Sequence, residues 1–553
     1  MRLSKEEQPG SNRASQRRRF LQTTALGTVS AALLPALAGA RELASGIPAT
    51  GEVGSFEQDE VAIADLQAQM GSGKLTAHAL AEKYLARIAE IDKQGPTLNS
   101  VIELNPDALS IADALDKERK EKRARGPMHG IPVLIKDNLD TADHMQTTAG
   151  SLALTGSRPA ADSFVVKRLR EAGAVILGKT NLSEWANIRS THSTSGWSGR
   201  GGLTRNPYAL DRNPCGSSSG SGAAVSANLC AVAVGTETDG SVVCPSSANG
   251  IVGIKPTLGL VSRAGVIPIA HSQDTPGPMA RTVRDVAVLL SVMAGFDAND
   301  SATSDLRSKP PLDYTNYLDA NGLRGARLGV ARKYFGFNDA VDALMEDAIK
   351  EMKRLGAEII DPADLPSHGK FDDTEFTVLL YELKADLNTY LAGRPDAPVR
   401  SLKDVIDFNE HNKAQEMPYF GQDIFLKAEA KGPLTEKEYT EALQANHRLS
   451  QQEGIDAVMD KFHLDAIIAP TAGPAWTTDL ANGDHAVGGS SNAAAVAGYP
   501  DIAVPAGFVF GLPVGISFFG KAWSEPTLLK LAYAFEQATK ARKKPQFLPS
   551  VKI

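Results

Sequence analysis

Short apolar runs, each bounded by glycine, proline or asparagine, limit the folds open to this chain. A continuous apolar run of strand length is typical of a strand buried on both faces, because a strand with one face in solvent alternates apolar and polar residues. The runs are GIPVLIKDN (130–138), AVILGK (174–179), CAVAVGTE (230–237), AIIAP (466–470), DIAVPAGF (501–508) and PVGISFFG (513–520). They predict the strands of a buried sheet.

Amphipathic segments lie before and between these runs. Residues 61–92 place apolar side chains at three- and four-residue spacing and are interrupted by Gly-Ser-Gly, and residues 108–126 follow the same pattern. Residues 163–173 and 282–295 are similar, and residues 300–450 are more polar and mostly helical, without a chemical motif. The length alone would suggest about three or four domains, but no linker-like break interrupts the body of the chain. Buried strands separated by helices predict an α/β sheet.

The first 40 residues resemble a twin-arginine export signal. SQRRRFLQ (15–22) precedes an apolar run, 23–37, and the A-x-A cleavage site at 38–40. We expect a bacterial protein exported to the periplasm or the exterior. The alternative is a retained membrane anchor, but the apolar run is shorter than the roughly 20 residues that span a bilayer. Residues 41–60 are small and polar, and we expect a disordered lead-in.

Charge and cysteine content exclude several classes of protein. The net charge of −7 gives no footprint for binding nucleic acid, which requires a basic face. Cys215, Cys230 and Cys244 are an odd number without a CxxC pair, which argues against a disulfide framework or a zinc site. Two alternatives stay open for them: small buried residues, or one disulfide formed in an oxidising compartment.

Two pattern matches do not have the context that their function needs. GAVILGKT (173–180) fits the P-loop pattern, but the residues between its glycines are the apolar strand itself, so no turn is left for phosphate. CGSSSGSGAA (215–224) contains G-x-S-x-G around Ser218, but a nucleophile elbow needs a strand running into the serine, and the preceding residues form no apolar run.

A second Gly/Ser-rich turn suggests a different use of these serines. GTETDGSVVCPSSANGIVGIKPT (235–257) follows a helix and a strand, so the two turns can face each other at one end of the sheet. A serine needs a base to become a nucleophile, and no histidine lies near either turn. Lys136, at the end of the run 130–138, is the natural candidate because burial favours the neutral amine.

Together these motifs resemble the amidase signature family. The resemblance rests on GIPVLIKDN, CGSSSGSGAAV, GTETDGSVVCP, GIVGIKPT and SQDTPGPMARTVRD, in this order along the chain. It implies a single large α/β domain over residues 61–545, with a mixed central β-sheet wrapped by α-helices and with no metal or organic cofactor. The expected partner is a small amide or an amidated peptide, with no nucleic acid and no stable insertion in a membrane.

The resemblance also implies a Ser–cis-Ser–Lys catalytic set. Ser241 is the expected nucleophile, Ser217 the bridging serine and Lys136 the base. Ser218 and Asp239 are further candidates for contact with substrate. The expected oxyanion donors are the backbone N–H groups of Thr238, Asp239, Gly240 and Ser241. In this scheme the neutral lysine takes a proton through Ser217 while Ser241 attacks the amide carbon.

Two departures from the family pattern bear on the substrate. Where the family commonly reads GGSIR, this chain reads DGSVV. Asp239 places a carboxylate beside the oxyanion site, and Val243 replaces an arginine that pairs with substrate carboxylates in some members. The variant looks most like the peptide amidase branch, which removes the C-terminal amide of peptides. The alternatives are an arylamide or acylamide hydrolase of the same family and, more remotely, an exported peptide-binding protein without catalysis.

Overall fold

The structure is a computed structural model that describes residues 53–121 and 123–551. The expected export signal lies outside the described residues. Residues 53–60 fall in the predicted lead-in but contact the rest of the chain: Phe56 meets the ring of Tyr84 at 5.4 Å, and Glu60 forms an ion pair with Arg542 at 2.8 Å. The packed part of the chain therefore extends N-terminal to the boundary predicted at Val61.

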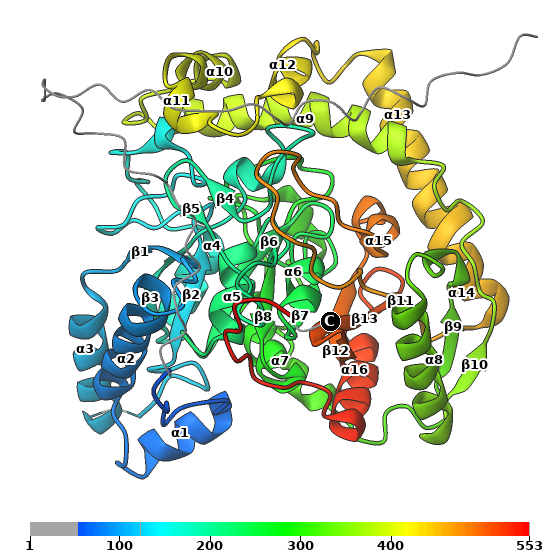
Figure 1. Cartoon of the computed structure of the whole chain (residues 1–553), viewed down its shortest axis with the longest axis horizontal. Coiled ribbons are helices and arrows are strands. Elements are labelled where there is room, and N and C mark those ends of the chain that lie inside the picture. Colours follow the sequence, from blue (N-terminus) through cyan, green and yellow to red (C-terminus); the bar gives the residue numbers. More distant parts are fainter. Residues whose placement is uncertain (1–52, 122, 552–553) are drawn as a thin grey trace, which may run out of the picture. The chain divides into compact units, whose positions relative to one another are not determined.

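An eleven-stranded mixed sheet forms the centre of the described residues (Figure 1). Its order is β1-β3-β2-β6-β8-β7-β12-β13-β11-β9-β10. Strands β3, β2 and β6 are parallel to one another, β11, β9 and β10 are parallel, and the strands between these two groups pair antiparallel. The strands are β1 (Val101–Leu104), β2 (Pro132–Lys136), β3 (Val175–Thr180), β6 (Val232–Glu237), β7 (Val252–Lys255), β8 (Thr275–Ala280), β9 (Arg327–Val330), β10 (Glu358–Ile360), β11 (Ala466–Pro470), β12 (Asp501–Val509) and β13 (Leu512–Phe519). A separate pair joins β4 (Trp197–Ser198) and β5 (Gly202–Leu203).

All six apolar runs form strands as predicted, and five further strands of the main sheet were not predicted. β8 is the most instructive of these, because its sequence, TPGPMA, has two prolines and lies inside the sheet. Proline lacks the N–H that a central strand normally donates. Within β8, only Met279 and Ala280 pair with β7. The two prolines lie beyond this ladder and pair with β6 alone.

Helices surround this sheet. In the described residues they are α1 (Ile63–Gly71), α2 (Ala77–Arg87), α3 (Ala108–Glu121), α4 (Phe164–Glu171), α5 (Ser219–Ser226), α6 (Val243–Ala248), α7 (Val283–Met293), α8 (Asp339–Arg354), α9 (Asp372–Ala392), α10 (Leu402–His411), α11 (Lys413–Glu416), α12 (Asp423–Glu429), α13 (Lys437–His447), α14 (Asp456–Phe462), α15 (Ser491–Ala497) and α16 (Glu525–Thr539). The α/β class and the mixed sheet flanked by helices are therefore confirmed.

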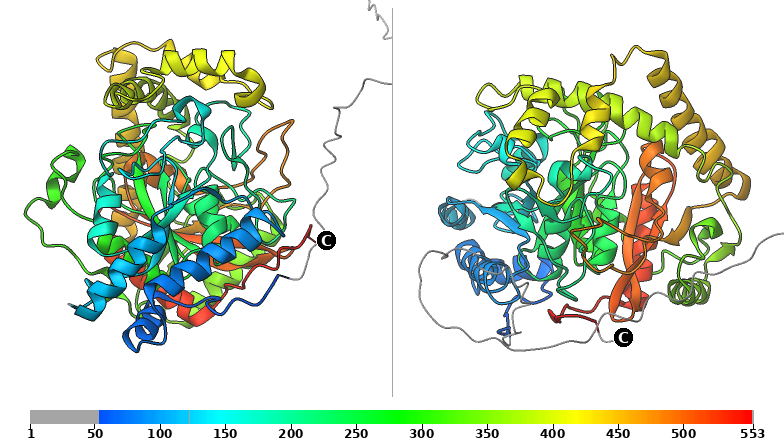
Figure 2. Two further views of the ribbon diagram at one scale, coloured as in Figure 1. Left: turned by 90° about the vertical axis from the view of Figure 1, so that its left-hand side faces the viewer. Right: turned by 45° about the horizontal axis from the view of Figure 1, so that its top comes forward.

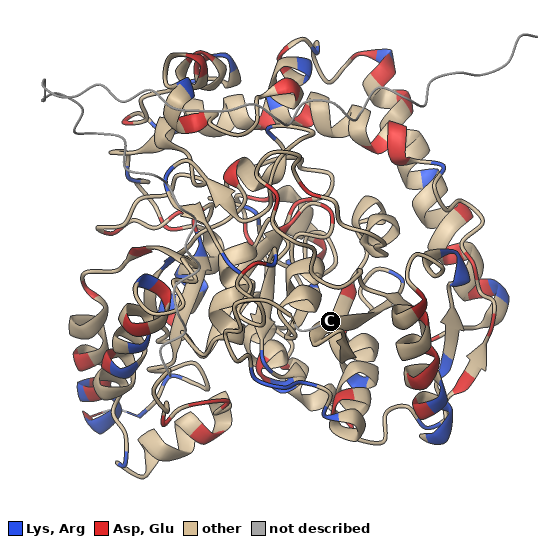
Figure 3. Ribbon diagram, viewed as in Figure 1, with Lys and Arg blue, Asp and Glu red and all other residues tan. Residues whose placement is uncertain are grey.

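The position of each helix follows its composition. α5 and α6 consist of small and uncharged residues and pack against the central strands, whereas charged side chains concentrate on outer helices such as α3, α8 and α9 (Figure 3). In Figures 1 and 2, helices α9 to α12 lie together at one edge of the fold. No helix among the described residues combines the length and the apolar character needed to cross a membrane.

The first turn of α5 approaches neighbouring backbone so closely that only glycine fits. A Cβ atom added at Gly220 would lie 2.2 Å from the carbonyl oxygen of Ser100 and 2.4 Å from that of Asn181. The Gly220 N–H donates to the same Asn181 carbonyl at 3.0 Å. The glycines of the Ser/Gly-rich stretch thus allow backbone to pack against backbone.

We predict that Gly220→Ala lowers the free energy of unfolding by about 3 kcal/mol or more, because backbone atoms cannot move aside as a flexible side chain can. Gly71→Ala is the matched control, since a Cβ there meets nothing within 4 Å. Its effect should stay within about 1 kcal/mol. Urea unfolding of both variants measures the difference, and equal stabilities would refute the packing argument.

Candidate active site

The two Gly/Ser-rich turns lie against each other, as the sequence predicts. The first turn contains a cis peptide bond between Gly216 and Ser217, and the second lies between β6 and α6. The N–H of Ser218 donates to the carbonyl of Ser241 at 3.2 Å. A disulfide joins Cys215 to Cys244 with their Cα atoms 6.1 Å apart, while Cys230 is free and buried. The alternatives left open for the cysteines are thereby resolved, and the turns are joined covalently.

Lys136 lies at the C-terminal end of β2 and points between these turns. Its Nζ is 2.8 Å from Ser217 Oγ, 2.9 Å from Thr236 Oγ1 and 3.2 Å from the Thr236 carbonyl oxygen. The side chain is completely buried, and this burial lowers the pKa of Lys136 to about 7, although Asp274 and Glu237 favour the charged form. A large fraction of Lys136 is therefore neutral near pH 7.

Thr236 on β6 determines how a neutral Lys136 is oriented. A neutral amine that donates its two N–H bonds to the two oxygens of Thr236 keeps its lone pair for the hydroxyl proton of Ser217. Asn138 Nδ2 also donates to Thr236 Oγ1, at 2.9 Å, and so helps to fix this side chain. The arrangement leaves the lysine ready to accept a proton from Ser217.

Ser218 contacts the same strand. Its side chain is completely buried, and its hydroxyl donates to the Thr236 carbonyl at 3.0 Å and accepts from the Thr236 N–H at 3.2 Å. No strand leads into this serine; Ser218 immediately precedes α5. The hydroxyl of Ser218 is thus engaged within the protein, in a contact that fastens the first turn to β6.

Ser241 and the turn before it, unlike Ser218, have free hydrogen-bonding groups. The Ser241 hydroxyl makes no hydrogen bond with another described residue, and neither do the backbone N–H groups of residues 238–241. The next two N–H groups, of Val242 and Val243, donate to the buried Glu237 carboxylate at 2.7 and 3.0 Å. Gly240 has a φ of 75°, a conformation that glycine adopts without strain. Consecutive free N–H groups of this kind form a concave site for an anion.

Residues 269–274 hold the first part of this turn. Thr238 Oγ1 donates to Asp274 at 2.5 Å, and Gln273 Nε2 donates to the Thr238 carbonyl at 3.2 Å. The second oxygen of Asp274 accepts the N–H groups of Ile269 and Ala270. Burial raises the pKa of Asp274 to about 6, although its hydrogen bonds oppose this shift. Gln273 and Asp274 of the SQDT motif therefore hold the turn 238–241 in place through Thr238.

Asp239 belongs to a second network. Its carboxylate accepts from Ser491 Oγ at 2.6 Å and from Asn492 Nδ2 at 3.3 Å. Asn492 also donates to Glu375 of α9, which in turn accepts from Gln273 at 2.9 Å. Burial raises the pKa of both Asp239 and Glu375, and Asp239 raises that of Glu375 further. In the described part of the chain, no lysine or arginine forms an ion pair with either carboxylate.

A neighbouring group of His271, Glu382 and Asp386 has the residue types of a metal site, with potential ligand atoms within 4.8 Å of one another. Its carboxylates already accept hydrogen bonds from the backbone: Glu382 from Ser272 at 2.9 Å and Asp386 from His271 at 2.9 Å. Tyr439 donates to Glu382 as well, at 2.8 Å. The group therefore ties the segment before Gln273 to α9.

The sequence patterns did not identify several of these residues as part of the site. Asn138 and Gln273 lie within the recognised motifs, and Asn138 follows Lys136 by two residues, so their positions offered a signal. Glu375 and Asn492 lie far away in the chain, in segments without a chemical motif. Only the folded chain brings them to residues 238–241.

Comparison with known proteins shows which sequences and structures this chain resembles. The amidase family matches residues 79–529. A probable amidase of Arabidopsis thaliana is 46% identical over 503 residues, covering 89% of this chain and 93% of the relative. The structure of native peptide amidase from Stenotrophomonas maltophilia is 52% identical, covers 89% of this chain and 100% of that chain, and has a TM-score of 0.85. A peptide amidase in complex with the competitive inhibitor chymostatin matches with the same identity and coverage and a TM-score of 0.87.

We predict that a fluorophosphonate attaches to Ser241 and not to Ser218. The free Ser241 hydroxyl lies beside four free N–H groups that can hold a phosphonyl oxygen, whereas the Ser218 hydroxyl is buried and engaged. Peptide mapping by mass spectrometry locates the label. Ser241→Ala should abolish labelling and Ser218→Ala, the matched control, should retain it; a label on Ser218 would contradict the assignment.

Proposed function

Because the chain belongs to the amidase family and is a hydrolase of amide C–N bonds, we propose that it removes the terminal carboxamide of amidated peptides and similar neutral primary amides through an acyl-enzyme on Ser241. The observation that supports this most is the run of four free N–H groups, 238–241, ending at a free serine hydroxyl. The contact between Lys136 and Ser217 supplies the base that such a serine needs.

The reaction begins with proton transfer. Neutral Lys136 takes the hydroxyl proton of Ser217 while Ser217 takes that of Ser241, and Ser241 Oγ forms a bond to the amide carbon. The carbonyl oxygen becomes an oxyanion that accepts hydrogen bonds from the turn 238–241, and each such donor typically contributes about 3–4 kcal/mol to lowering the barrier.

The same proton relay, formed by Lys136 and Ser217, then runs in reverse. The proton held by Lys136 passes through Ser217 to the leaving nitrogen, and the C–N bond breaks to release ammonia. Water enters, loses a proton to the same relay and attacks the ester of Ser241, which releases the carboxylic acid and restores the serine. A lysine with a pKa of about 7 suits both directions, because it can accept and return the proton near neutral pH.

The surroundings of the turn favour a neutral substrate. Asp239 and Glu375 lie beside it without a cationic partner among the described residues. Val243, at the position of the carboxylate-pairing arginine of some relatives, is 1% exposed and begins α6. A substrate carboxylate would therefore lie beside two acidic side chains that have no ion-paired cation and would compete with them for protons, whereas an amidated peptide brings no carboxylate to this place.

The solved relatives support a peptide substrate. Peptide amidase is 52% identical to this chain, and a peptide amidase is inhibited competitively by chymostatin. Asp239 was expected from the sequence to contact substrate, but its hydrogen bonds to Ser491 and Asn492 favour a carboxylate that holds the turn in place.

We predict that kcat/KM for a C-terminally amidated peptide exceeds that for glutamine or malonamate, both of which bear a carboxylate, by about a hundredfold. A hundredfold ratio corresponds to about 3 kcal/mol, which is the size of the repulsion between two like charges in contact with a protein surface at an effective dielectric constant of about 20. Ammonia release from each substrate measures it.

Asp239→Asn should narrow this ratio by raising the relative rate for malonamate, because one like charge is removed. Asp347→Asn is the control, since Asp347 lies on α8 with its side chain 75% exposed. A wild-type preference for the carboxylate-bearing amides would refute the charge argument. Amine release from anilides that exceeds ammonia release from peptide amides would favour the arylamide hydrolase instead.

A further inference from the structure

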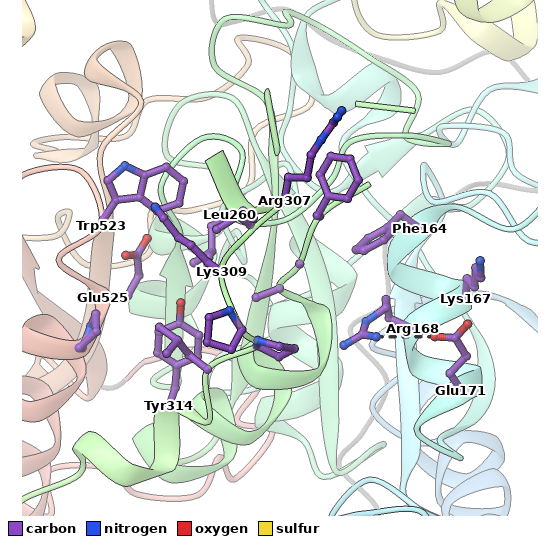
Figure 4. A pocket seen from close by; sticks show the side chains of 18 residues that line it. Phe164, Lys167, Arg168, Glu171, Leu260, Arg307, Lys309, Tyr314, Trp523 and Glu525 are labelled. Atoms are coloured by element: carbon purple, nitrogen blue, oxygen red, sulfur yellow. Dashed lines mark ion pairs between the residues drawn. The ribbon is translucent and has the colours of Figure 1, made fainter. Parts of the chain in front are cut away.

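A second cavity, of about 580 Å³, lies away from the serines (Figure 4). Its walls come from α4, from the chain that follows α7, from residues 306–314 and from residues 523–526 at the start of α16. Neither Lys136, Ser217 nor Ser241 lines it. The mechanism proposed above makes no use of this cavity.

The walls are largely aromatic and apolar. Phe164, Phe296, Tyr314 and Trp523 contribute rings, and Leu312 is 41% exposed at its edge. Cavities lined in this way, with a few polar groups, are typical of sites for small organic ligands. A ligand that fits here needs an apolar body, and the rings favour an aromatic one.

Three cations at this cavity have no carboxylate partner among the described residues: Lys167, Arg307 and Lys309. Lys309 Nζ lies 4.8 Å from the centre of the Trp523 ring, and the Arg307 guanidinium lies 4.9 Å from that of Phe296. The other charged residues at the cavity are paired with each other or have a shifted pKa. Arg168 pairs with Glu171 at 3.7 Å, as Figure 4 shows, and burial raises the pKa of Glu525. The cavity is thus cationic in a chain of net charge −7.

Tyr314 offers a hydrogen-bond donor to this cavity. The residue is 2% exposed, and its hydroxyl forms no hydrogen bond with another described residue. In Figure 4 the hydroxyl points into the cavity, toward Lys309. The hydroxyl can therefore donate a hydrogen bond to an acceptor placed in the cavity.

We propose that this cavity binds a small organic anion with an apolar, aromatic body. The anionic group accepts a hydrogen bond from Tyr314 and pairs with Lys309, and the rings of Trp523 and Phe164 contact the body. Charged hydrogen bonds of this kind are stronger than neutral ones.

The test uses anilinonaphthalene sulfonate, a fluorescent anion, and phenylnaphthylamine, which has the same rings without the sulfonate. The full chain is first labelled at Ser241 with a fluorophosphonate, so that the amidase site cannot contribute. We expect the anion to bind about tenfold or more tightly than the neutral probe, measured by fluorescence titration. Equal affinities, or no binding of the anion, would overturn the proposal.

Two variants locate the site. Lys309→Gln and Tyr314→Phe should each weaken binding of the anion by about fivefold to tenfold and leave the neutral probe unchanged, while amide hydrolysis by unlabelled enzyme stays at the wild-type rate. Lys350→Gln, on exposed α8, is the matched control and should change neither. Unchanged binding of the anion in both cavity variants, with unfolding temperatures close to that of the wild type, would show that the anion binds elsewhere.

Discussion

The contact between Lys136 Nζ and Ser217 Oγ is the interaction on which the site depends. It requires a lysine whose charge is suppressed by burial, and the end of β2 provides that burial between two strands that run parallel to it. It also requires that Ser217 be held next to the Lys136 amine by a rigid segment of chain. The first turn meets this need because the second turn, β6 and α5 all fix its position.

The second turn is also fixed in position by its neighbours. Four backbone N–H groups remain free while the residues around them are held in place: Glu237 accepts the next two N–H groups, and Gln273 and Asp274 hold Thr238. The disulfide between Cys215 and Cys244 links the two turns close to their serines. A disulfide at this place also suits the oxidising compartment to which the predicted export signal would deliver the protein.

The sequence predicted the strands that carry the site because their residues are continuously apolar, and it predicted the facing turns from their order in the chain. It could not predict β8, whose prolines are tolerated because the pairing of β8 with β7 stops at Met279. Nor could it predict Glu375, since a single carboxylate in a polar helix has no local signal. The pairing of Cys215 with Cys244 was open for a similar reason: three cysteines close in sequence do not reveal which two side chains meet.

The central claim is that neutral Lys136 starts the reaction, and the pH dependence of acylation tests it most directly. The second-order rate constant for fluorophosphonate labelling of Ser241 should be constant above about pH 8 and fall tenfold per pH unit well below the lysine pKa of about 7, since protonation removes the base. Lys136→Arg should remain slow throughout, because guanidinium cannot be deprotonated in proteins. A wild-type rate constant that is unchanged between about pH 5 and 8, or a Lys136→Arg variant as fast as the wild type, would contradict the account.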